Sequence, residues 1–212
     1  VSIVTNVGIL GYFKYYNFFI ISFSKLFGYD SVPYSLNIIL PVGISFYTFQ
    51  TLSYTIDIYR NKFRPAKTLL DFSNFVAFFP QLVAGPIERA SNLLPQILKK
   101  RIFYYNQGVM GLKLILWGMF KKVIIADKLA LSVNPIFENY LNLNGGILLL
   151  GLIYFSFQIY CDFSGYSDIA IGTAKLFGIE LMSNFKFPYF SRNIAEFWSR
   201  WHISLSSWFK DY

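Results

Sequence analysis

The sequence predicts an all-α membrane protein, polytopic and built with re-entrant or broken helices. Three observations predict this class: 55% of the 212 residues are hydrophobic, only 14% are charged, and the mean hydropathy is +0.43. A soluble domain carries about 25% charged residues, so this chain has too few polar groups to cover a water-exposed surface. The 24 Phe and 16 Tyr residues also exclude a disordered chain.

The net charge is +8, and the basic residues gather in short stretches between apolar segments. This pattern is typical of the cytoplasmic loops of membrane proteins. We therefore expect the lipid bilayer as a partner and expect no nucleic acid. Residues 1–212 are expected to form a single membrane-embedded domain. We also expect a fragment truncated at both ends, because the chain begins at Val1 without a Met and stops at Tyr212 within an apparently helical segment.

The first apolar segments differ in whether they are long enough to cross a bilayer. Residues 1–12 are too short to cross a bilayer alone, and an aromatic run follows over residues 15–29. Residues 36–59 predict the clearest spanning helix, because a span needs roughly 20 apolar residues and this stretch has a single charge, near its end. Pro41 and Gly43 fall in its first turns, where membrane helices tolerate a kink.

The apolar stretch over residues 72–85 is too short to span and lies between two basic stretches, residues 60–67 and 89–101. Basic flanks on both sides predict that it enters and leaves the membrane on the cytoplasmic side, as a re-entrant element. The alternative is a surface helix packed on the helical bundle.

Residues 108–133 form a long apolar segment that carries four lysines and Asp127. Charge inside such a segment predicts a tilt, a break or a water-filled face. Residues 134–145 contain no Lys or Arg and are expected to be extracellular. Residues 146–160 then cross back, and further basic residues are expected on the cytoplasmic side: Lys175, Lys186, Arg192 and Arg200.

The single histidine of the chain, His202, is a candidate catalytic residue. Asn193 with Glu196 three residues later predicts a helix start with a reciprocal cap. On a continuous helix the imidazole would share a buried face with Trp198 and Ser206. Burial disfavours imidazolium, so the ring is predicted to be neutral and able to accept a proton. The alternative is a purely structural hydrogen-bonding role.

Two carboxylates, Asp162 and Asp168, follow the apolar segment over residues 146–160. They lie on different faces of a helix, and Gly165 is expected to break the helix between them. No His or Cys cluster completes a metal site, so no metal is predicted. An acid/base pair is one interpretation, but we favour ion pairs with Lys or Arg at the bilayer edge.

Five stretches taken together resemble the membrane-bound O-acyltransferase family. The resemblance is strongest to its bacterial polysaccharide branch, which includes O-acetylases of alginate and peptidoglycan, and weaker to D-alanyl exporters for teichoic acid. The stretches are residues 40–50 with 57–60, 79–86, 120–127, 158–168 and 196–212.

The resemblance implies a membrane O-acyltransferase domain, a helical ring around a funnel. An acetyl group would pass from a cytoplasmic donor, acetyl-CoA or another acyl thioester, towards hydroxyls of an extracytoplasmic polysaccharide such as alginate. No bound cofactor is implied. His202 matches the histidine of the family's Trp-His-x-Ser motif and would line the tunnel. The principal catalytic histidine would lie downstream of Tyr212, so we expect this chain alone to be inactive.

Other expectations come with the family resemblance. Substrate contacts are expected from Trp198, Trp201, Ser206, Asp162 and Asp168. The expected location is the bacterial cytoplasmic (inner) membrane, with several passes. Expected partners are an extracytoplasmic acetyltransferase or a polysaccharide assembly subunit, besides the polysaccharide acceptor. D-alanyl transfer to teichoic acid, a non-enzymatic transporter and an assembly scaffold stay open as alternatives; a transporter would be supported by inverted repeats, and we find none.

Overall fold

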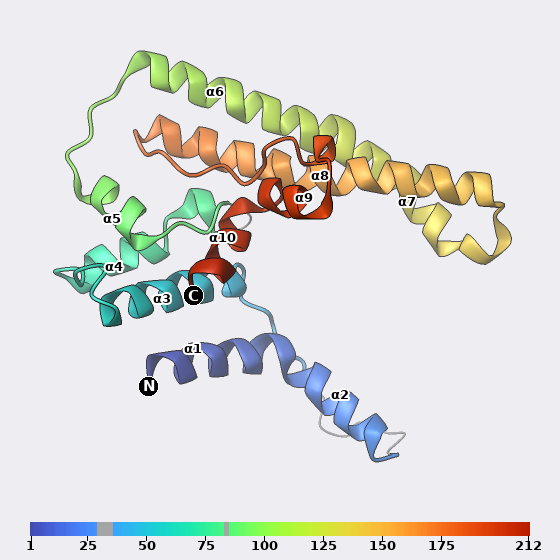
Figure 1. The fold of residues 1–212 in the computed structure, drawn as a ribbon, viewed down its shortest axis with the longest axis horizontal. Helices are drawn as coiled ribbons and strands as arrows, with labels where there is room; N and C mark the ends of the chain where they lie inside the picture. The colour runs from blue at the N-terminus through green and yellow to red at the C-terminus, as the bar shows by residue number, and fades with distance from the viewer. Residues whose placement is uncertain (29–35, 83–84) are drawn as a thin grey trace.

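The computed structural model describes residues 1–28, 36–82 and 85–212, and the regular structure of these ranges is entirely helical (Figure 1). The prediction of an all-α fold is confirmed for this part of the chain. The α-helices are α1 (Ser2–Leu10), α2 (Tyr16–Leu26), α3 (Ile44–Tyr59), α4 (Leu69–Val76), α5 (Ala90–Leu98), α6 (Tyr105–Met119), α7 (Asp127–Glu138), α8 (Gly145–Leu176), α9 (Ile194–Arg200) and α10 (Ile203–Asp211). Short 3-10 turns lie at Phe79–Gln81, Tyr140–Asn142 and Pro188–Phe190, and π-helical turns at Gly11–Tyr15 and Phe120–Ala126.

The long helix α8 runs antiparallel to α6 and α7 (Figure 1). Within the described ranges it is the one helix that is long and apolar enough to cross a membrane. The π-helical turn Phe120–Ala126 joins α6 to α7 without interrupting the rod. The charges predicted to break or tilt the segment 108–133 are therefore accommodated by a change of helix type, which brings adjacent lysines against α8.

Gly165 does not break α8, contrary to the prediction from sequence, because it is a point of contact between two helix backbones. A Cβ atom on Gly165 would lie 2.8 Å from the carbonyl oxygen of Gly118 on α6. One heptad along, a Cβ on Gly172 would lie 2.6 Å from the carbonyl oxygen of Gly111. Small residues at such positions let membrane helices approach closely, and the packing outweighs the roughly 1 kcal/mol that glycine costs in a helix.

The predicted spanning helix over residues 36–59 is shorter than expected. Residues 36–41 have no regular structure, and α3 begins only at Ile44. Gly43 precedes it with φ 76°, a left-handed conformation that ends rather than continues a helix. Pro41 and Gly43 therefore mark the start of the helix and not a kink within it. Residues 29–35, the first of which ends the aromatic run over residues 15–29, fall outside the described ranges.

The segment predicted to be re-entrant, residues 72–85, is divided into α4 and the 3-10 turn Phe79–Gln81. Residues 83–84 lie outside the described ranges. The side chain of Phe75 on α4 packs with α5 and with Ala174 near the end of α8 in a buried apolar cluster. The segment thus contacts the bundle, and its entry into the bilayer stays a prediction.

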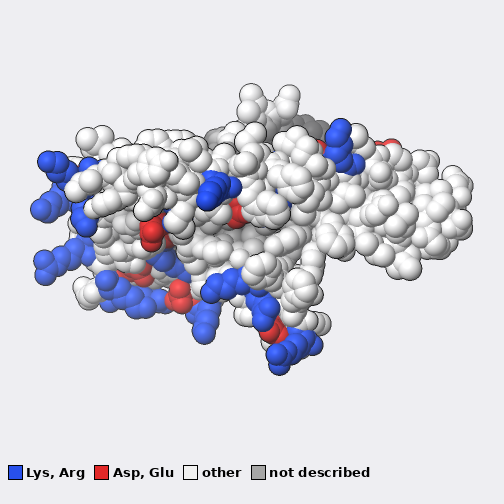
Figure 2. All heavy atoms as spheres, turned by 90° about the horizontal axis from the view of Figure 1, so that it is seen from above, with Lys and Arg blue, Asp and Glu red and all other residues white. Residues whose placement is uncertain are grey.

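Lys and Arg lie over one end and the middle of the molecule but hardly at all over its other tip (Figure 2). Figure 2 shows Lys and Arg over the end that carries the loops flanking α4 and α5, and almost none at the opposite tip, where α7 turns into α8. Residues 134–145, which contain no Lys or Arg, belong largely to this tip, as the last turns of α7, a 3-10 turn and the start of α8. Their separation from the basic loops agrees with the predicted opposite sides of the membrane.

After α8 the chain turns at Gly178 and runs back along the same helix. The Tyr189 hydroxyl donates a 2.5 Å hydrogen bond to the carbonyl oxygen of Ser156, in the middle of α8. The sequence predicted that Lys186, Arg192 and Arg200 lie on the same side as Lys175. They do not lie with Lys175 at the basic end, because the segment that carries them runs back along α8. The reversal places α9 and α10 beside the middle of α8 and against α3 (Figure 1).

Candidate active site around His202

His202 lies in a sharp turn between two short helices, not within one helix as the sequence predicted. Its φ of 44° and ψ of 54° are left-handed, and it occupies the N-cap position of α10. Such a conformation is uncommon for a residue other than glycine, and residues held in it cluster at functional sites. The shared helical face predicted for His202, Trp198 and Ser206 therefore does not exist.

The start of α9 is nevertheless as predicted. The side chain of Asn193 accepts a hydrogen bond from the Glu196 backbone N–H, at 2.8 Å. Glu196 reaches back to the backbone N–H of Arg192, also at 2.8 Å, one residue before the expected partner. Its other carboxylate oxygen pairs with Arg200, four residues on. This cap positions α9 so that its last residue enters the turn at His202.

The irregular segment over residues 179–187, which runs back along α8, holds the His202 turn in place through backbone hydrogen bonds. The carbonyl oxygen of Asn184 accepts from the Ile203 N–H, and the carbonyl oxygen of Arg200 accepts from the Lys186 N–H, both at 3.0 Å. Asn184 is completely buried. These two bonds replace the helical bonds that would otherwise join α9 to α10, which explains why the continuous helix predicted from sequence is absent.

The His202 ring packs edge-on against Phe163 of α8, with ring centroids 4.7 Å apart. Its Nε2 atom is buried and has no hydrogen-bond partner in the described part of the chain. Burial lowers the pKa of His202 to about 4. This direction agrees with the predicted neutral imidazole, and the Nε2 atom is available to bond a ligand.

Aromatic rings surround the turn. Trp201 stacks on Phe197 at 5.5 Å and contacts the rings of Tyr160 and Phe185. Trp198 is exposed and touches the ring of Phe197. The Ser206 hydroxyl donates to the carbonyl oxygen of Trp201 at 3.3 Å, so it closes the turn from the α10 side. Substrate contact by these residues stays a prediction.

Asp162 and Asp168 pair with two consecutive lysines of the π-helical turn. The Nζ atom of Lys121 lies 2.6 Å from Asp168 and 2.9 Å from the Ser164 hydroxyl. Lys122 lies 2.6 Å from Asp162 and 2.8 Å from Asp127. The predicted ion pairs with lysine are present, with partners between the packed helices; the choice between a structural role and acid/base chemistry stays a prediction.

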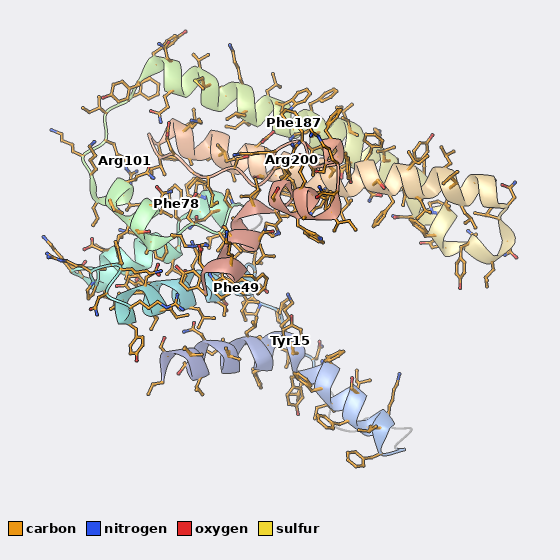
Figure 3. The ribbon with its side chains drawn as sticks, in the orientation of Figure 1. Tyr15, Phe49, Phe78, Arg101, Phe187 and Arg200 are labelled. Carbon is orange, nitrogen blue, oxygen red and sulfur yellow. The ribbon has the colours of Figure 1, made fainter. Side chains whose placement is uncertain are left out.

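Two cavities open beside these ion pairs and share four lining residues, Trp117, Lys121, Tyr160 and Phe187. The larger, about 440 Å³, is mainly aromatic. The smaller, about 150 Å³, is lined by Asp168, Ser183 and Phe185 among others. Figure 3 shows Phe187 beside α8, close to Arg200.

His202 is not among the residues that line these two cavities. Phe163 touches both its ring and Phe185, which lines the smaller cavity. The arrangement therefore separates a charged, cavity-lining group at Lys121 and Asp168 from a neutral imidazole one aromatic layer away. A tunnel-lining position of His202 stays a prediction.

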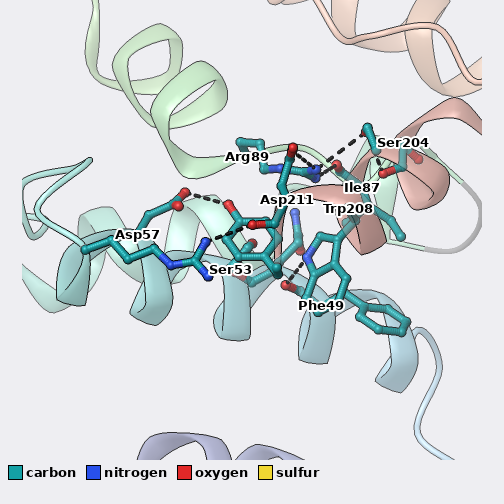
Figure 4. A network of polar contacts seen from close by, with 12 residues as sticks. Phe49, Ser53, Asp57, Ile87, Arg89, Ser204, Trp208 and Asp211 are labelled. Carbon is teal, nitrogen blue, oxygen red and sulfur yellow. Dashed lines mark hydrogen bonds and ion pairs between the residues drawn. The ribbon is translucent and has the colours of Figure 1, made fainter.

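A second polar network holds α10, and with it His202, against α3 (Figure 4). The Trp208 indole N–H donates to the carbonyl oxygen of Phe49 at 3.1 Å, and the Tyr212 hydroxyl donates to Asp57 at 2.7 Å. Arg89 pairs with Asp211 at 2.9 Å. Sequence reasoning missed this network, although the single charge near the end of an apolar helix, Asp57, signals a buried partner.

Glu88 is a further buried residue that the sequence did not single out. Its carboxylate accepts hydrogen bonds from the Met182 backbone N–H at 2.5 Å and from the Asn92 side chain at 2.7 Å. Burial raises the pKa of Glu88 above its ordinary value. Since Met182 is two residues from Asn184, the carboxylate fixes the segment over residues 179–187 that supports the His202 turn.

Comparison with known proteins gives a consistent result. Over 213 residues the chain is 43% identical to the probable alginate O-acetylase of Pseudomonas aeruginosa, covering 100% of this chain and 41% of that protein. It is 37% identical over 237 residues to the peptidoglycan O-acetyltransferase of Helicobacter pylori, covering 100% of this chain and 45% of that protein. It is 33% identical over 177 residues to the teichoic acid D-alanyltransferase of Streptococcus thermophilus, covering 81% of this chain and 42% of that protein.

The chain thus spans less than half the length of these curated relatives. Residues 66–212, which include the Lys–Asp ion pairs and the whole His202 turn, match the model of the membrane-bound O-acyltransferase family. The predicted resemblance is confirmed, and the chain is a membrane helical protein that belongs to the membrane-bound O-acyltransferase family.

Proposed function

We propose that the full-length protein transfers an acetyl group from a cytoplasmic acyl thioester, such as acetyl-CoA, towards hydroxyls of an extracytoplasmic polysaccharide. The observation that carries the proposal is the half-buried imidazole of His202, whose buried Nε2 atom has no hydrogen-bond partner among the described residues, in a chain of this family. The names of the alginate and peptidoglycan O-acetylating relatives support the acetyl group and the polysaccharide acceptor.

In this proposal His202 is a positioning residue. Its Nε2 atom hydrogen-bonds the donor or the acceptor, while a histidine beyond Tyr212 accepts the proton of the attacking hydroxyl. Attack of the hydroxyl oxygen on the thioester carbonyl forms the ester bond, breaks the carbon–sulfur bond and releases the thiol, which takes up a proton. The smaller cavity, lined by Lys121 and Asp168, offers charged groups to a polar part of the donor. The larger, mainly aromatic cavity excludes water.

The protein is proposed to cross the bacterial inner membrane several times, with the basic loops over residues 60–67 and 89–101 in the cytoplasm. An extracytoplasmic acetyltransferase or a polysaccharide assembly subunit would then receive the acetyl group on the other side. D-alanyl transfer is a second candidate, supported by the 33% identity to a teichoic acid D-alanyltransferase. Proteoliposomes supplied with acetyl-CoA or with a D-alanyl thioester separate the two.

Replacing His202 by Asn in the full-length protein is expected to lower acetyl transfer by about tenfold, the worth of one positioning hydrogen bond. Asn adopts the left-handed conformation readily, so the loss reports the imidazole and not the backbone. Transfer of radiolabelled acetyl groups is measured in proteoliposomes at equal protein content. Ser199→Ala, an exposed position on α9, is the matched control and retains full activity. Unchanged transfer by the Asn variant contradicts the positioning role.

The low pKa of His202 also predicts how its contribution depends on pH. Because the imidazole is neutral above its pKa of about 4, its contribution is constant at neutral and mildly acidic pH and is lost only as the pH falls through that value. The ratio of wild-type to His202→Asn transfer rates is therefore flat between about pH 5.5 and 8. A ratio that declines below about pH 6.5 indicates an ordinary, solvated imidazole.

A further inference from the structure

A basic loop joins α5 to α6 at the end of α8. Lys99, Lys100 and Arg101 follow α5 in an extended conformation, and Figure 3 shows Arg101 on this loop. Within the described ranges none of these three side chains has an ion-pair or hydrogen-bond partner. Lys175, in the last turn of α8, adds a fourth cation and lies 3.5 Å from Glu180. Uncompensated positive charge therefore accumulates at this helix end.

The cations line two cavities rather than projecting separately into solvent. One, about 250 Å³, is lined by Lys99, Lys100 and Arg101, and the other, about 270 Å³, by Arg101 and Lys175. Both also contain Gly178, Ile102 and Tyr104 in their walls. Gln96 fixes one wall, because its side-chain amide exchanges hydrogen bonds of 2.8 and 3.0 Å with the backbone of Glu180. One wall of the first cavity is thus held in place by these two hydrogen bonds.

Large apolar side chains follow the cations directly. Ile102, Phe103 and Tyr105 are 62%, 70% and 75% exposed. The length of α8 indicates how deep these side chains lie relative to a bilayer. The helix is about 48 Å long, whereas the hydrocarbon core of a bilayer is about 30 Å thick. The C-terminal end of α8 therefore reaches the headgroup region. There, cations meet lipid phosphates while neighbouring aromatic and aliphatic groups enter the acyl-chain region.

We propose that this loop, with the end of α8, binds the headgroup of an anionic phospholipid. Lys99, Lys100 and Arg101 contact the phosphate, and Ile102 and Phe103 lie against the acyl chains. Charge complementarity and the adjacent exposed apolar residues favour a lipid over a soluble phosphate, which has no apolar part to cover them. The cations also face the carbonyl end of α8, which favours positive charge, but this interaction gives no role to the exposed apolar residues.

The test measures lipid binding to the full-length protein by native mass spectrometry, with dioleoylphosphatidylglycerol and dioleoylphosphatidylcholine as probes. The variant K99Q/K100Q/R101Q is expected to bind phosphatidylglycerol at least about tenfold more weakly, with binding of phosphatidylcholine unchanged. The matched control is K62Q/R64Q/K67Q, which removes the same charge from the other basic loop. It is expected to change phosphatidylglycerol affinity less than about twofold. Size-exclusion elution verifies that both variants are folded.

Two further arms identify the ligand. Phe103→Ser is expected to weaken binding of dioleoylphosphatidylglycerol but not of its dihexanoyl analogue, whose chains are too short to reach the side chain. Excess coenzyme A is expected to leave phosphatidylglycerol bound. Displacement by coenzyme A assigns the cavities to a soluble phosphate and overturns the proposal. An equal loss of affinity in the two triple variants, or no loss in either, overturns it as well.

Discussion

Replacing Lys121 by Met is expected to destabilise the folded protein by about 3–5 kcal/mol, the usual consequence of removing one partner from a buried ion pair. The side chains of Lys121 and Asp168 are 9% and 22% exposed, and the ammonium also donates to the Ser164 hydroxyl. Without the ammonium, Asp168 has no partner cation among the described residues. The free energy of unfolding of the full-length protein is measured by denaturant titration in detergent micelles.

Two variants make this result specific. Lys121→Met with Asp168→Asn removes both charges and is expected to recover more than half of the loss, because no carboxylate is left uncompensated. Lys113→Met is the control, since the residue is exposed on α6, the helix that leads into the π-helical turn of Lys121, and it is expected to change stability by less than about 0.5 kcal/mol. A double variant no more stable than Lys121→Met would show that the side-chain stem, and not the charge, stabilises this region.

Replacing Gly165 by Leu is expected to prevent the native packing of α6 against α8. Even one carbon at this position would lie 2.8 Å from the Gly118 carbonyl oxygen and 3.1 Å from the Lys122 backbone nitrogen, and neither backbone atom can move alone. Overpacking costs about 1–3 kcal/mol for small additions; we expect Gly165→Ala to fall in this range and Leu to exceed it. The same titration measures the loss.

Gly145 provides the matched control for this substitution. It lies at the start of the same helix, and a Cβ there has no neighbouring atom within 4 Å. Gly145→Leu is expected to be neutral or to stabilise by up to about 0.8 kcal/mol, through helix propensity alone. Equal losses at Gly145 and Gly165 would contradict a specific contact between α6 and α8 at Gly165.

These two regions show what could be read from the sequence. Charged residues in an apolar chain predicted ion pairs, and Asp162 and Asp168 do form them. Their partners could not be assigned, because sequence alone does not show which lysines of the segment 108–133 face α8, and the π-helical turn that carries Lys121 and Lys122 changes the register of that segment. Gly165 was interpreted as a breaker from its propensity alone. The seven-residue spacing of Gly111 with Gly118, and of Gly165 with Gly172, is the signal that identifies a packing face.

The His202 region shows a different limit of sequence reasoning. The cap formed by Asn193 and Glu196 is local, and it was predicted from four residues of sequence. The break at His202 is not local, because it depends on the Asn184 carbonyl oxygen, which accepts from Ile203, and on the Lys186 N–H, which donates to Arg200. Both residues lie on a segment that first has to reverse after α8. The helix propensity of residues 194–211 does not indicate that these hydrogen bonds compete with those of a continuous helix. Burial of the imidazole was predicted correctly, although the helical face invoked for it does not exist.

The direct backbone contact between α6 and α8 also determines how the large cavity is bounded. Two of its sides, at Trp117 and at Tyr160, belong to helices with no side chain between them at the glycine contacts, so these helices cannot slide or separate without breaking that contact. The remaining side is the short turn Pro188–Phe190, preceded by Phe187 in a left-handed conformation. The cavity is therefore bounded on one side by directly packed helix backbones and on the other by a turn that the side chain of Tyr189 holds against α8.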